Sequence, residues 1–103
     1  MITTMRTANI RRGKAAEAFE WAIKVAIHAK DKCAQVTDLQ VVRNIGGPIN
    51  QLHWIGTYGS MADMEATYKW FDSDAEIQKL IADALARELF EVDAADHIYA
   101  TVP

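Results

Sequence analysis

The stretch that decides the fold is Gln51–Asp63, QLHWIGTYGSMAD, which has the pattern of a strand, a tight bend and the start of a helix. Side chains alternate between the two faces of a strand, so Trp54 and Tyr58 share one face and His53 points to the other. A glycine supplies the bend, and Ser60 follows it as a helix cap, with an aspartate three residues later. The stretch therefore predicts two aromatic rings and an imidazole on one strand of a sheet, but no particular reaction.

The rest of the chain switches between strand-like and helix-like periodicity. In the first helical segment one apolar stripe includes Ile23 and Ile27, and a second includes Trp21 and Val25, so this helix needs cover from two directions. The last helix is expected to begin at a Ser73 cap. In chain order the expected elements are strand Ile2–Ile10, helix Lys14–Lys32, strand Thr37–Ile45, strand Asn50–Tyr58, helix Met61–Asp72, helix Ser73–Leu89 and strand His97–Val102.

This order predicts one α+β domain over residues 1–103, with the ferredoxin-like βαββαβ topology. The four strands form an antiparallel sheet and the helices cover one face. Each strand carries apolar or aromatic side chains on at least one of its two faces. In a sheet with one face in contact with water, the strands should instead alternate cleanly between apolar and polar residues. The sequence therefore predicts a homodimer in which the uncovered sheet faces cover each other.

Composition excludes several classes of function. The 103 residues suffice for a single core, and the net charge of −3 lacks the basic excess of a nucleic-acid-binding protein. No apolar run approaches the roughly 20 residues that span a bilayer, and the first residues resemble a strand rather than a signal peptide. Cys33 is the only cysteine, so no internal disulfide is expected and the cytoplasm is the simplest location.

Three short motifs resemble the NIPSNAP-type branch of the dimeric α/β-barrel superfamily. In Met5–Thr7 followed by Gly13–Lys14, a strand with an arginine and a threonine leads to a glycine-lysine helix start, which is similar to the opening of that family. Tyr58 and Ser60 resemble the tyrosine and serine that end its third strand. Asp72–Ala75 resembles the acidic, serine-containing turn before its final helix.

The resemblance implies a homodimer in which two sheets close into a barrel, with a small cavity between each sheet and the partner. The wider superfamily includes cofactor-independent monooxygenases, haem-degrading enzymes and small isomerases. One departure matters: Trp54 occupies the position of the family's histidine and Gly56 that of its tryptophan. His53 is one residue out of register, so the role of that histidine does not transfer.

A haem-degrading function is not favoured. Asn9 and Trp70 resemble two residues of haem-degrading and monooxygenase relatives, but the last predicted helix carries no histidine to complete their set. The spacing of His28, His53 and His97 matches no metal-ligand motif. No cofactor and no metal are therefore expected.

The candidate pocket consists of Arg6, His53, Trp54, Tyr58 and Tyr99. The three aromatic residues could line the barrel interior and hold a flat or apolar small molecule, or they could simply fill the dimer core. The histidine could supply charge, or it could be a half-buried sheet residue bonded to backbone or water.

Arg6 has two interpretations. Its planar guanidinium could anchor a carboxylate or enolate in the cavity, or it could pair with Asp96 or Glu91 across the dimer interface. The expected function is accordingly the binding or transformation of a small, largely apolar metabolite, by cofactor-free oxidation or isomerisation. The alternative is a non-enzymatic dimeric module whose barrel is filled by its own side chains.

Overall fold

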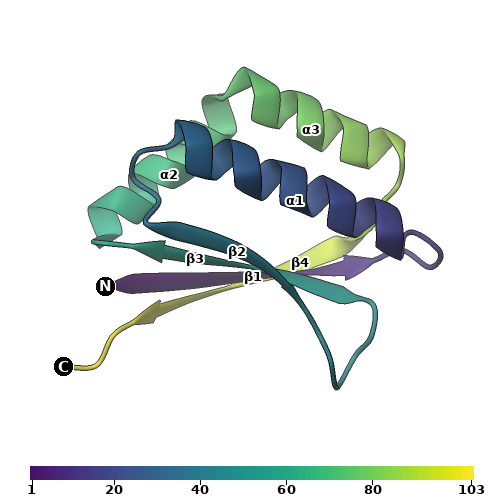
Figure 1. The fold of residues 1–103 in the computed structure, drawn as a ribbon, viewed down its shortest axis with the longest axis horizontal. Helices are drawn as coiled ribbons and strands as arrows, with labels where there is room; N and C mark the ends of the chain where they lie inside the picture. The colour runs from purple at the N-terminus through teal and green to yellow at the C-terminus, as the bar shows by residue number, and fades with distance from the viewer.

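The computed structural model describes residues 1–103 and has the predicted order of elements, with all three helices on one side of the sheet (Figure 1). The elements are β1 (Ile2–Ile10), α1 (Ala15–Lys32), β2 (Asp38–Arg43), β3 (Gln51–Tyr58), α2 (Met61–Ser73), α3 (Ala75–Ala86) and β4 (Phe90–Ala100). The strand order is β2-β3-β1-β4, and every neighbouring pair is antiparallel. The ferredoxin-like βαββαβ fold is confirmed.

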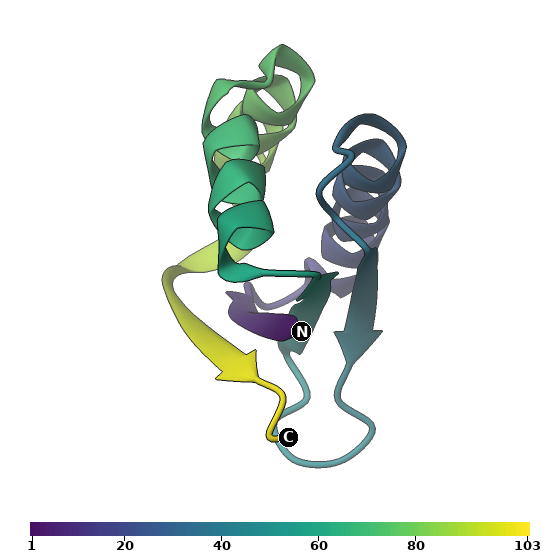
Figure 2. The same ribbon diagram turned by 90° about the vertical axis from the view of Figure 1, so that its left-hand side faces the viewer.

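The register of the two central strands determines which side chains face the helices. Arg6 on β1 lies opposite Trp54 on β3, and Ile2 lies opposite Tyr58. Residues of this parity are covered by α1 on one side and by α2 and α3 on the other, whereas no helix covers the second face of the sheet (Figure 2). The alternation predicted from Gln51–Asp63 therefore separates a helix-facing set from an open-face set.

The core lies between the helices and this first face. Leu52, Ile77 and Leu89 are its largest completely buried apolar side chains, and the Trp21 indole extends across it from α1. The Trp21 Nε1–H donates a hydrogen bond of 2.7 Å to the Leu80 carbonyl of α3. Because a buried indole N–H needs a partner, this bond fixes the spacing between α1 and α3.

Two predicted boundaries are wrong. The last strand begins at Phe90 rather than at His97, because its backbone pairs with β1 while nearly all of its side chains are exposed and show no apolar periodicity. The cap of α3 is Asp74, whose side chain accepts a hydrogen bond of 3.1 Å from the Ile77 amide. Ser73 instead ends α2 and donates to the carbonyl of Lys69.

The buried stripe of α1 also differs from the prediction. Ile23 and Ile27 are exposed, whereas Ala22, which the prediction placed on the same stripe, and Ala29 are completely buried. Small side chains on the inner face bring the helix close to the sheet, which moves the larger aliphatic residues to its flank. None of the three helices is both long and apolar enough to cross a membrane.

Candidate functional site

A cavity of about 380 Å³ lies between the helix layer and the sheet. Most of its wall is hydrophobic, with a few polar groups that come from β1, β3 and α2. The lining side chains are Thr4, Arg6, Trp21, Val25, Leu39, Trp54, Tyr58, Tyr68, Phe71, Asp72, Ile77 and Ile81. An apolar cleft with a small number of polar groups is the usual form of a small-molecule site.

The structure divides the predicted pocket residues between the two faces of the sheet. Arg6, Trp54 and Tyr58 line the cavity. His53 lies opposite Thr7 of β1, and Tyr99 of β4 lies opposite Thr3, so both belong to the open face. The predicted position of Trp54 and Tyr58 inside an intersubunit barrel is wrong. Both side chains lie on the face of the sheet that α1, α2 and α3 cover.

Tyr58 lies on the floor of the cavity and depends on a glycine. An ideal Cβ at Gly56 would lie 2.6 Å from the Tyr58 hydroxyl and 2.9 Å from the Thr4 hydroxyl, so only glycine leaves room for the ring. Burial raises the pKa of the Tyr58 phenol, and a hydrogen bond with Thr4 partly opposes this effect. The phenol therefore stays protonated near neutral pH and can donate a hydrogen bond.

Arg6 is held by an acidic residue of the same subunit. Its Nε donates to Asp96 Oδ1 at 2.7 Å and its Nη2 donates to Asp96 Oδ2 at 2.8 Å, a bidentate pair between neighbours on β1 and β4. The predicted pairing of Arg6 across a dimer interface is therefore wrong, and so is the alternative in which Glu91 is its partner. These hydrogen bonds raise the pKa of Arg6 and lower that of Asp96, so the pair stays fully ionised at neutral pH.

Trp54 lines the cavity, and its indole nitrogen is a buried donor without a partner. Its indole packs edge-on against Trp21, with ring centroids 5.9 Å apart, and lies 6.1 Å from Phe90. The Trp54 Nε1 is buried and has no hydrogen-bond partner. Leaving such a group unsatisfied costs about 1–3 kcal/mol, a cost that natural proteins tend to accept at functional sites.

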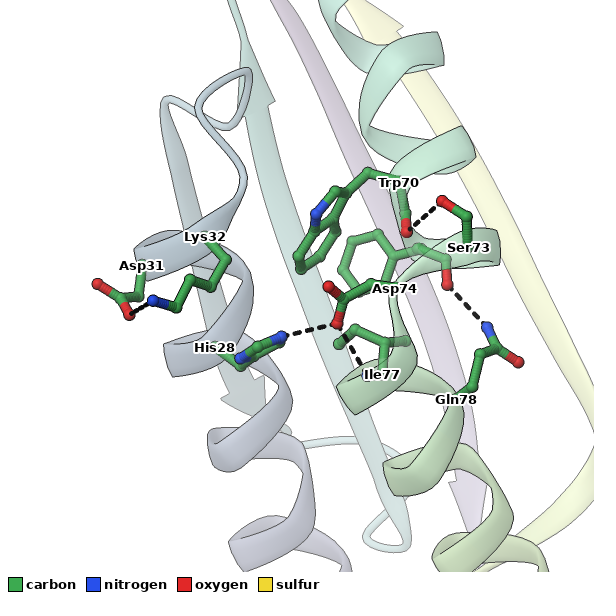
Figure 3. A network of polar contacts seen from close by, with 9 residues as sticks. His28, Asp31, Lys32, Trp70, Ser73, Asp74, Ile77 and Gln78 are labelled. Atoms are coloured by element: carbon green, nitrogen blue, oxygen red, sulfur yellow. Dashed lines mark hydrogen bonds and ion pairs between the residues drawn. The ribbon is translucent and has the colours of Figure 1, made fainter.

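A polar contact joins the helices to one another (Figure 3). His28 of α1 and the α3 cap Asp74 form a hydrogen bond of 2.8 Å between Nε2 and Oδ2. The imidazole also stacks on the Trp70 indole of α2, with centroids 5.6 Å apart. This contact therefore joins α1 to the junction of α2 and α3, one helical turn from the cavity residues Val25 and Ile77.

Both ring nitrogens of His53, on the open face, contact other side chains. His53 Nδ1 lies 2.8 Å from the Thr7 hydroxyl, and its Nε2 lies 2.6 Å from Asn44 Oδ1. On the same face the rings of His97 and Tyr99 stack with centroids 6.2 Å apart. No group of three or more histidine, cysteine, aspartate or glutamate side chains is placed to bind a metal ion.

Sequence reasoning missed several cavity residues. Trp21, Tyr68 and Phe71 fit the apolar stripes of their helices, and periodicity does not distinguish a packed side chain from one beside a cavity. Asp72 lies at the end of α2 and gives no signal of its own. Asp72 reaches the cavity wall only because of the position at which α2 packs over the sheet, and this packing depends on contacts between distant segments.

The pKa values of the Asp74 and Asp96 carboxyl groups are lowered in the folded protein, which predicts a loss of stability in acid. The hydrogen bond to His28 lowers the pKa of Asp74 below its ordinary 3.8, followed by the bond from the Ile77 amide. Arg6 has the same effect on Asp96. A carboxyl whose pKa is lower in the folded state stabilises the protein above its unfolded-state pKa, and this stabilisation is lost as pH falls through the folded value.

We therefore expect the urea midpoint to fall between about pH 5 and pH 2. An Asp74→Asn variant retains a capping side chain but no longer titrates, so the decrease should be smaller than in the wild type. An Asp31→Asn variant provides the control, since Asp31 is exposed and pairs only with its neighbour Lys32. Equal acid dependence in the wild type and Asp74→Asn would contradict the role given to Asp74.

The fold is shared with proteins of known structure. No protein-family model and no curated protein matches the chain. A NIPSNAP domain protein from Burkholderia xenovorans is 15% identical, with a TM-score of 0.77 over 99% of this chain and 95% of that chain. A NIPSNAP family protein of unknown function from Agrobacterium tumefaciens is 20% identical, with a TM-score of 0.76 over 96% and 86%.

A third structure, described as an antibiotic biosynthesis monooxygenase, is 10% identical, with a TM-score of 0.75 over 100% of both chains. The class is thus a ferredoxin-like α+β fold. Within this class the chain is similar to NIPSNAP proteins and to antibiotic biosynthesis monooxygenases, and the resemblance seen in the sequence is confirmed at the level of the fold.

Proposed function

We propose that this protein binds a small, largely apolar molecule in the cavity between its helices and its sheet. The observation that carries the proposal is the cavity itself. Its volume of about 380 Å³ lies within the roughly 300–1,000 Å³ typical of ligand pockets. The aromatic side chains of Trp21, Trp54 and Phe71 offer flat apolar surfaces, while Arg6 and Tyr58 supply hydrogen-bond donors.

The same arrangement supports cofactor-independent oxidation or isomerisation of an enolisable or phenolic substrate. Both reactions develop negative charge on a substrate oxygen, and fixed donors stabilise such charge. The guanidinium of Arg6 and the protonated phenol of Tyr58 are donors of this kind. The similarity to antibiotic biosynthesis monooxygenases agrees with this chemistry, although it concerns the fold alone.

We also propose that the open sheet face forms a homodimer in the cytoplasm. Tyr99 is half exposed on this face, and the apolar side chains of Met5 and Ile55 lie on the same parity of the sheet. The buried, unpaired Cys33 is consistent with a reducing compartment. The cavity lies on the helix-covered face of the sheet, whereas the proposed dimer uses the open face. Side chains could therefore fill the space between the two subunits without preventing ligand binding.

The proposal is tested by closing the cavity. Ile81 lines the cavity and is 40% exposed, so an Ile81→Trp substitution should place an indole in the opening at little cost in stability. Calorimetric titration with 2-naphthamide, a flat neutral probe, should give saturable binding to the wild type. The substitution should weaken this binding about tenfold or more, equivalent to at least about 1.4 kcal/mol.

A Leu85→Trp variant provides the matched control. Leu85 lies one turn further along α3, is 74% exposed and does not line the cavity. Its affinity for 2-naphthamide should equal that of the wild type. The absence of binding to the wild type, or an equal loss in both variants, would overturn the proposed function.

A further inference from the structure

The guanidinium of Arg6 is only partly used by the protein. An arginine carries five N–H donors arranged in a plane, with one pair on the Nε edge and another across the two Nη atoms. Asp96 occupies the Nε edge through Nε and Nη2. Nη1 donates to no protein side chain or carbonyl and Nη2 uses only one of its two N–H groups, so the second edge, with one N–H from each Nη, is free. Arg6 lines the cavity, and its side chain is 57% exposed.

Two phenols and a hydroxyl stand in the same wall. Tyr58, Tyr68 and Thr4 line the cavity together with Arg6. The Tyr58 hydroxyl lies above Gly56, beside the Thr4 hydroxyl with which it forms a hydrogen bond, and it stays protonated. A planar charged group with two free N–H donors, flanked by neutral O–H donors, matches the in-plane lone pairs of a carboxylate.

The rest of the wall is mostly apolar, and it includes Trp54, the cross-strand neighbour of Arg6. Trp21, Trp54, Phe71, Ile77 and Ile81 offer aromatic and aliphatic surface with no charged group among them. A ligand that satisfies both parts needs a flat apolar body with an acidic group at one end. We propose that the cavity takes a flat, unsaturated carboxylic acid in its anionic form, with the carboxylate on the free edge of Arg6. This inference rests on the proposed function and names the ligand class.

Two acidic side chains affect this assignment. Asp96 balances the charge of Arg6 and holds its plane in one orientation, which makes Asp96 a positioning residue for the bound acid. Asp72 also lines the cavity, but it is exposed, and water and salt screen its repulsion of an anion. The ligand's charge is therefore recognised mainly by Arg6 and the neighbouring hydroxyl groups.

The test compares two flat probes of nearly the same shape, an anionic carboxylate and a neutral amide. Dissociation constants are measured for 2-naphthoate and for 2-naphthamide with the wild type, Arg6→Met and Arg6→Lys. The wild type should bind 2-naphthoate about tenfold more tightly than 2-naphthamide, as expected for charge-assisted hydrogen bonds. Arg6→Met should remove this preference, because the affinity for 2-naphthoate should fall about tenfold more than the affinity for 2-naphthamide. Arg6→Lys retains the charge but not the fork, so its preference should be intermediate.

The outcomes separate this inference from the function on which it rests. If 2-naphthamide binds the wild type but 2-naphthoate binds no more tightly, the acid assignment fails and the proposed function stands. If neither probe binds, the proposed function fails and the acid assignment fails with it. If Arg6→Met weakens both probes equally while urea unfolding shows that it remains folded, Arg6 shapes the cavity without recognising an acid, and the inference is overturned.

Discussion

A Leu52→Ala substitution should lower the free energy of unfolding by about 2–5 kcal/mol. Leu52 is completely buried at the centre of the core, where β3 meets α1 and α3. Truncation removes the transfer free energy of the lost methyl groups and leaves a void that a close-packed interior fills only in part. Because domains of this size have a total stability of about 5–15 kcal/mol, the loss should be evident as a large shift of the urea midpoint.

An Ile45→Ala variant is the control for this substitution. Ile45 is fully exposed in the connection between β2 and β3. Its replacement should change the free energy of unfolding by no more than about 0.5 kcal/mol. Similar losses for Leu52→Ala and Ile45→Ala would mean that Leu52 is not packed as the structure shows.

A Gly56→Ala substitution should destabilise the protein by about 1–3 kcal/mol. The added Cβ would lie 3.0 Å from the Tyr58 Cζ, in addition to its short approaches to the Tyr58 and Thr4 hydroxyls. The Tyr58 ring is only 3% exposed, so it has little room to move away. Its displacement would also change the floor of the cavity, so we expect weaker binding of 2-naphthamide together with a lower urea midpoint.

Gly46→Ala supplies the matched control for this change. A Cβ at Gly46 would meet nothing within 4 Å, and its backbone does not adopt the left-handed conformation that favours glycine. The substitution should be neutral or slightly stabilising, because alanine restricts the unfolded chain more than glycine does. If Gly56→Ala proved as neutral as Gly46→Ala, the close contact with Tyr58 would be disproved.

The fold could be predicted because each element has its own local signal. The alternation in Gln51–Tyr58 and the change to helical periodicity at each helix are properties of short segments. The same alternation correctly separated His53 from Trp54 and Tyr58. The beginning of β4 gave no such signal, because Val92 and its neighbours are exposed and the strand is defined only by its pairing with β1.

The candidate site could be predicted only in part, because it depends on contacts between distant segments. Trp54 and Tyr58 were recognised as sharing a face, but alternation does not say which face the helices cover. For Arg6 the sequence offers either a ligand or an ion pair with Asp96 or Glu91 across a dimer interface, and only the strand register shows that Asp96 lies beside it within one subunit. The contact between His28 and Asp74 joins residues 46 positions apart, and no sequence motif indicated it.

The central claim is that a small molecule binds between the helices and the sheet, and the tryptophan side chains test it most directly. The chain has three indole groups, of which Trp21 and Trp54 line the cavity and Trp70 does not. In a ¹H–¹⁵N correlation spectrum titrated with 2-naphthamide, the indole signals of Trp21 and Trp54 should shift and saturate together while that of Trp70 stays in place. Unchanged Trp21 and Trp54 signals at saturating probe, or a shift confined to Trp70, would contradict the claim.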